Sequence, residues 1–168
     1  MTDVLDQQWD EMSTLDACIL IEETCASIYY KYAGIFADSP KFLTLWTEMA
    51  IEEEKHADVF RAIRAIHCSN YNCSDNENDL IKMIFEKLKS LNESINSKKQ
   101  TLRDAILTGL ILEKSVEKYH LEASKVTLDP KLAKLLDVMM EYSHGHVEML
   151  QLETDSIDTE LGSEKWAP

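Results

Sequence analysis

The chain has 168 residues, enough for one domain with a substantial core, and carries a formal net charge of −14. This charge argues against nucleic acids and anionic membrane surfaces as partners, because both would repel an acidic protein. Four cysteines without a dense framework and an acidic start without an apolar run predict a cytoplasmic protein, and no apolar run is long enough to span a bilayer.

Only four glycines and three prolines, with few alternating stretches, predict an all-α protein. The first helix should run from Ser13 or Thr14 to about Ala37. Its inner stripe, spaced by three and four residues, is Leu15, Ile19, Glu22, Ala26, Tyr29, Ala33 and Phe36. Asp38-Ser39-Pro40 should end it and start a second helix, Pro40 to about Ile66.

The second helix places two polar residues, Glu53 and His56, among core positions. They share the inner stripe with Phe42, Trp46, Met49, Phe60 and Ile63. Burying an ionised carboxylate is costly without a partner, and a metal ion is one partner that removes the cost.

The second half of the chain should contribute three more helices. A polar connection precedes an amphipathic helix over 78–95, the third helix should run from Thr101 to about Ser124, and the fourth from Pro130 to about Leu152. We therefore expect one four-helix domain over residues 1–154, with an extra helix in the long connection and a flexible tail over 155–168.

The four main helices repeat as two pairs. Glu22 lies 31 residues before Glu53, and Glu113 lies 30 before Ser143; Glu22 lies 34 residues before His56, and Glu113 lies 33 before His146. Each pair ends in a helix that begins with proline. This pattern predicts an internal duplication.

The repeated positions suit a dinuclear metal site in a helical bundle. Such sites take one Glu from each of two helices and a Glu-x-x-His pair from each of the other two. The predicted ligands are Glu22, Glu53, His56, Glu113 and His146. Dinuclear sites of this kind hold iron or manganese, and a mononuclear iron, manganese or zinc site is the alternative.

The fourth helix offers two candidate pairs. Glu141 and His144 have the Glu-x-x-His spacing but fall on a polar face, whereas Ser143 and His146 have the apolar flanks of Glu53 and His56. We therefore predict His146 as the ligand, with Ser143 in place of the expected glutamate. Glu117, Glu141 and His144 are retained as fallback ligands.

The chain resembles the rubrerythrin-like branch of the ferritin-like di-iron superfamily over about residues 13–152. The resemblance rests on Glu22 with Tyr29, the stretch from Trp46 to Ala57, Glu113, and the run from Gly145 to Leu150. The chain lacks a rubredoxin domain with its two Cys-x-x-Cys motifs. Val116 stands where peroxide-reducing members carry a second glutamate, and His120 occupies the position that matches Tyr29.

The resemblance implies a di-iron four-helix bundle, a homodimer, and a peroxidase or ferroxidase that acts on peroxide, dioxygen or Fe(II). A separate protein would then donate the electrons for peroxide reduction. Tyr29 would hydrogen-bond to a ligand carboxylate. His120 would relay protons or add a ligand, with plain packing as the alternative for both. Because Ser143 replaces a carboxylate, a second hypothesis is a degenerate site in a binding or structural dimeric module.

Overall fold

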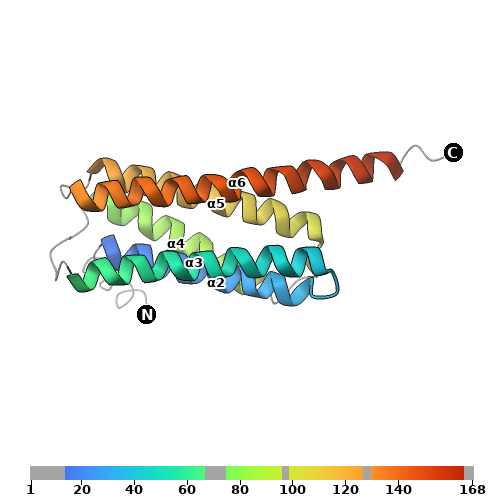
Figure 1. Ribbon diagram of the computed structural model, residues 1–168, viewed down its shortest axis with the longest axis horizontal. Coiled ribbons are helices and arrows are strands. Elements are labelled where there is room, and N and C mark those ends of the chain that lie inside the picture. Colours follow the sequence, from blue (N-terminus) through green and yellow to red (C-terminus); the bar gives the residue numbers. More distant parts are fainter. Residues whose placement is uncertain (1–13, 67–74, 96–98, 127–129, 165–168) are drawn as a thin grey trace. The chain divides into compact units, whose positions relative to one another are not determined.

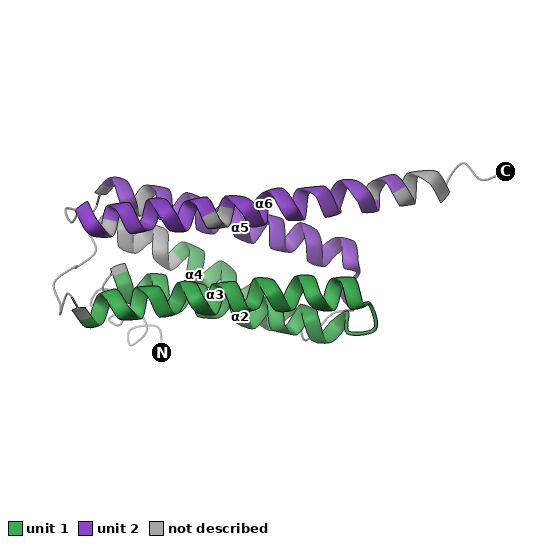
Figure 2. Ribbon diagram, viewed as in Figure 1, with its two compact units in different colours: residues 1–98 green, residues 99–168 purple. Residues whose placement is uncertain are grey.

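The computed structural model describes residues 14–66, 75–95, 99–126 and 130–164 (Figure 1). These residues contain no strand, which confirms the all-α prediction. The helices are α2 (Thr14–Ile35), α3 (Pro40–Ile66), α4 (Asp75–Ile95), α5 (Leu102–Val126) and α6 (Pro130–Glu164). None of these helices combines the length and the apolar character that a bilayer span needs. The chain divides into two compact units, residues 1–98 and 99–168 (Figure 2).

Two helix starts follow the signals expected from sequence. α3 begins at Pro40, whose missing N–H would be unsatisfied there in any case, and the Leu43 N–H donates to the Ser39 carbonyl at 2.9 Å. At the start of α5, the Asp104 N–H donates to Thr101 Oγ1 at 3.1 Å, and the Thr101 hydroxyl donates to the Asp104 carboxylate at 2.6 Å. The Thr101 oxygen satisfies a backbone donor that a helix leaves unpaired, whereas the Leu43 bond is the first regular bond of α3.

Three helix boundaries differ from the expectation. α2 ends at Ile35, two residues early, because Phe36 to Ser39 form the turn to α3. α4 begins at Asp75 instead of residue 78, since Asp and Asn are well suited to a first turn. α6 continues to Glu164, so the predicted end at Leu152 is wrong. Residues 155–164 contain no proline, and extending an existing helix costs little.

In the first unit, α2 and α3 form an antiparallel pair joined by a short turn, and α4 packs on α2 (Figure 1). The pair encloses an aromatic group. Trp46 stacks on Tyr29 with ring centroids 5.7 Å apart, and the ring centroid of Tyr32 lies 5.0 Å from that of Trp46. All three side chains are fully buried. Among the α4 side chains that the structure describes, from residue 83 onward, Ile84, Leu88 and Ile95 are buried.

Lys31 links α4 to the α2–α3 pair. Its ammonium donates to the backbone carbonyl of Asn92 at 2.8 Å and to the side-chain oxygen of Asn92 at 2.5 Å. The carbonyl belongs to the last turn of α4, where helix carbonyls lack partners within the helix and a cation is favourable.

The second unit is the pair of α5 and α6. Its buried apolar side chains include Ile106, Leu110, Val116 and Tyr119 in α5, and Leu136, Met139 and Leu150 in α6. The single-domain limits of 1–154 remain a prediction, but residues 155–164 belong to α6.

Candidate metal centre

The first unit brings three predicted ligands together. Glu22 on α2 and Glu53 and His56 on α3 are all buried, with exposed fractions of 0%, 3% and 7%. His56 Nδ1 lies 3.2 Å from Glu53 Oε2 and 3.9 Å from Glu22 Oε2. One ligand atom of each residue lies within 4.8 Å of the other two, so this cluster could hold a metal ion.

The spacing of these donors fits a divalent cation. Metal–ligand bonds of about 2.1 Å at ordinary coordination angles place neighbouring donor atoms about 3.0–3.4 Å apart. The Glu53–His56 distance falls in this range, and the Glu22–His56 distance of 3.9 Å is somewhat longer. The charges fit as well. Two carboxylates and a neutral imidazole balance one divalent ion, whereas protonating His56 would balance only one carboxylate.

The second unit brings two predicted ligands together, Glu113 on α5 and His146 on α6. His146 Nδ1 lies 3.3 Å from Glu113 Oε2, and both side chains are buried. The two residues match Glu22 and His56 in the predicted repeat.

The fallback ligands lie on the outside of the second unit. The His144 side chain is 59% exposed and that of His146 is 6% exposed. His144 Nδ1 lies 3.2 Å from Glu117, and its Nε2 lies 3.4 Å from Glu148. Glu141 is also exposed. The choice of His146 for the inner face is confirmed, while the Ser143 side chain lies outside the described residues.

The two residues assigned a supporting role are both buried. Tyr29 lies two turns after Glu22 on the inner face of α2 and stacks on Trp46. His120 lies two turns after Glu113 on α5, with its ring centroid 5.7 Å from that of Tyr119. The positions agree with the predicted stripes, and the roles of Tyr29 and His120 remain predictions.

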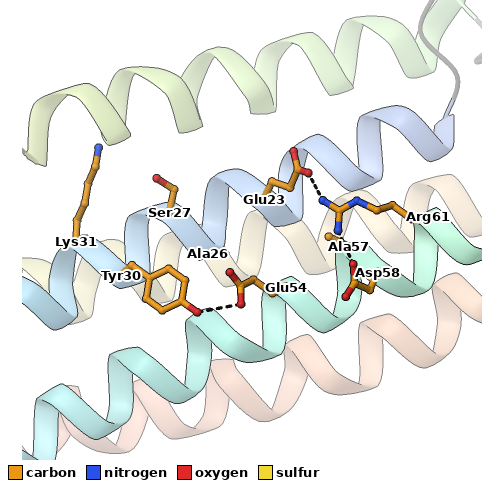
Figure 3. Close-up of a pocket in the computed structure, with 9 residues that line it drawn as sticks. All are labelled: Glu23, Ala26, Ser27, Tyr30, Lys31, Glu54, Ala57, Asp58 and Arg61. Atoms are coloured by element: carbon orange, nitrogen blue, oxygen red, sulfur yellow. Dashed lines mark hydrogen bonds and ion pairs between the residues drawn. The ribbon is translucent and has the colours of Figure 1, made fainter.

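Sequence reasoning missed a set of polar contacts on the outer side of the α2–α3 pair (Figure 3). The Tyr30 hydroxyl donates to Glu54 at 2.9 Å, which raises the pKa of Tyr30. Arg61 donates to both Asp58 and Glu23, and these contacts raise the Arg61 pKa. The available signal was the acidic residue that directly follows each ligand carboxylate, Glu23 after Glu22 and Glu54 after Glu53.

The first unit therefore presents a buried carboxylate–histidine cluster, and the second a buried carboxylate–histidine pair. These arrangements can bind a cation or share a proton. No protein-family model, curated protein or solved structure matches the chain.

Proposed function

We propose that the protein is a ferritin-like metalloprotein of rubrerythrin type that binds iron and oxidises Fe(II) with peroxide or dioxygen. The observation that carries the proposal is the buried group of Glu22, Glu53 and His56, with donor atoms spaced for a divalent ion. Carboxylates with a minority of imidazoles are the ligand set that suits such iron chemistry.

The residues of the first unit have distinct tasks in this proposal. Glu22 and Glu53 supply the negative charge that attracts and holds the cation, and His56 supplies a neutral donor beside them. The stack of Tyr29 on Trp46 fills the core one heptad away and excludes water. Iron supplies the electrons: two ferrous ions and two protons reduce one peroxide molecule to two waters.

We further propose that α2, α3, α5 and α6 form a ferritin-like four-helix bundle in which Glu113 and His146 complete the site. The repeat spacing in the sequence and the burial of both side chains support this. Homodimerisation, and a separate electron-donor protein for peroxide reduction, belong to the same proposal.

Metal analysis and Fe(II) oxidation test the proposal directly. Protein from iron-supplemented cells, or protein given Fe(II) without oxygen, should hold at least one ion per chain and oxidise Fe(II) faster than buffer. Glu53→Gln should abolish both properties. Glu52→Gln, which changes the exposed neighbouring carboxylate, is the matched control and should retain them. A wild-type protein that holds well below one ion per chain after anaerobic Fe(II) addition would refute the proposal.

The alternative function is a binding or structural dimeric module with a mononuclear, zinc-containing or empty site. It is favoured by the sequence of α6, in which Ser143 replaces the carboxylate expected three residues before His146. Under this alternative, wild-type protein shows no peroxide-dependent Fe(II) oxidation, and Ser143→Glu adds a second bound ion. Two ions and peroxide turnover in wild type would exclude it.

A further inference from the structure

The outer face of the α2–α3 pair contains a groove of about 720 Å³. Two cross-helix contacts bound it, Tyr30 with Glu54 and Arg61 with Glu23 (Figure 3). Between these contacts lie Ala26 and Ala57, whose small side chains are buried.

The groove is not lined by Glu22, Glu53 or His56 themselves, but two of its lining residues lie one helical turn from a ligand carboxylate. An α-helix turns about 100° per residue, so a residue four positions on lies one turn higher and only about 40° around the helix. Ala26 has this relation to Glu22, and Ala57 has it to Glu53. On both helices the groove therefore begins at an alanine that neighbours a ligand carboxylate.

The rim of the groove carries acidic side chains next in sequence to the buried carboxylates. Glu23 and Glu54 directly follow Glu22 and Glu53, and Asp58 lies one turn beyond Glu54. Lys31 directs its ammonium to Asn92 of α4 instead of these carboxylates. Arg61 is then the cation that lies among them, held by Glu23 and Asp58.

We propose that this groove is the route by which a divalent cation reaches Glu22, Glu53 and His56, and that Arg61 is its gate. The inference rests on the proposed metal site. Carboxylates at the rim raise the local cation concentration, and displacing Arg61 from Glu23 and Asp58 frees them to pass the ion inward. The two positive charges of the ion match the two carboxylates, Glu23 and Asp58, that release the guanidinium.

Stopped-flow binding of Co(II), followed by its visible absorption, tests the route in the full-length protein. At low ionic strength, Glu23→Gln with Glu54→Gln should slow association about threefold to tenfold, within the range of electrostatic steering. Arg61→Gln should accelerate it by a similar factor. The number of ions bound at equilibrium should not change in either variant. Glu48→Gln with Glu52→Gln removes the same charge from exposed positions of α3 outside the groove and should leave the rate nearly unaltered.

The outcomes separate the route from the site. The route is supported if the glutamate variant binds Co(II) more slowly and the Arg61 variant binds it faster, while the number of bound ions stays constant. Both rate changes should become smaller at high salt. If both groove variants match the α3 control, or if stoichiometry falls with the rate, the route is wrong although the metal site stands. If wild type binds no Co(II) or Fe(II), the proposed function fails first. Circular dichroism should show wild-type helicity in every variant, since exposed ion pairs contribute little to stability.

Discussion

The two helical pairs of this chain share a sequence pattern but differ in the charge that they bury. In α2–α3, two carboxylates accompany one imidazole: Glu22, Glu53 and His56. In α5–α6, the close pair is one carboxylate and one imidazole, Glu113 and His146, 3.3 Å apart. The first cluster therefore buries one more carboxylate than the close pair in α5–α6.

This difference shows how a duplicated pattern can diverge at a single position. The carboxylate that distinguishes the two pairs is Glu53, and its counterpart in the repeat is Ser143. Buried charges are tolerated when they are paired, and breaking such a pair is strongly destabilising. The first pair therefore has one more carboxylate to compensate, either by a cation or by a proton.

Replacing single histidines should have the largest effect on the difference in metal binding between the two helical pairs. His56→Gln removes a donor from the α2–α3 cluster and should abolish Co(II) binding. His146→Gln should weaken it less, because the first cluster stays intact. His144→Gln alters the exposed histidine, which lies beside Glu117 and Glu148, and should have no effect. Calorimetric titration measures all three, and equal losses in the first two variants would contradict the asymmetry.

Truncating one buried side chain in each helical pair shows how much the packing of that pair contributes to stability. Trp46→Ala deletes the ring that contacts Tyr29 and Tyr32 and should lower the free energy of unfolding by about 4 kcal/mol. Leu136→Ala, at the matching repeat position in α6, should cost about 3 kcal/mol.

Ile111→Ala is the control for these truncations. Ile111 is 67% exposed, and its loss should change stability by less than about 0.5 kcal/mol. Urea denaturation reports all three values. A cost for Trp46→Ala no larger than that of the control would show that the aromatic group is not a packed core.

Removing a helix cap should have a smaller effect, confined to α5. Thr101→Ala loses the oxygen that accepts from the Asp104 N–H and should cost about 1 kcal/mol. Thr101→Ser keeps the hydroxyl and should restore most of the loss. Amide hydrogen exchange should rise at the first turn of α5 and not in α2 or α3; a uniform rise would contradict a local cap.

The smallest expected effect is the titration of Tyr30 on the first pair. Its hydrogen bond to Glu54 raises the Tyr30 pKa, so the folded protein retains this proton more strongly than the unfolded chain. The resulting stabilisation is complete below the unfolded tyrosine pKa and is lost as the pH rises through the folded pKa. Glu54→Gln should lower the Tyr30 pKa in an ultraviolet titration; an unchanged titration would show that the bond is absent in solution.

Much of the fold followed from local signals in the sequence. Pro40 and Thr101 with Asp104 marked their helix starts correctly, because proline and capping residues act on the adjacent backbone. The end of α6 was missed because no strong stop signal follows Leu152, so residue patterns did not locate it. The apolar flanks of His146 identified its burial, since the helical period places it with Leu136, Met139 and Leu150.

The site was predictable only where its residues lay on inner stripes. Glu22, Glu53 and His56 met this condition, and their clustering followed. The groove was not predictable in the same way. Arg61 and Glu23 lie 38 residues apart, and their contact depends on how α2 and α3 align, which exposed polar residues do not reveal.

The short turn at residues 36–39 has a consequence for the order in which the chain folds during synthesis. It joins two helices that carry all three residues of the first cluster within 35 consecutive positions. Contacts between residues close in sequence form quickly, and chains fold from the N-terminal side as they are synthesised. The nascent chain can therefore bring Glu22, Glu53 and His56 together before α5 and α6 have been translated.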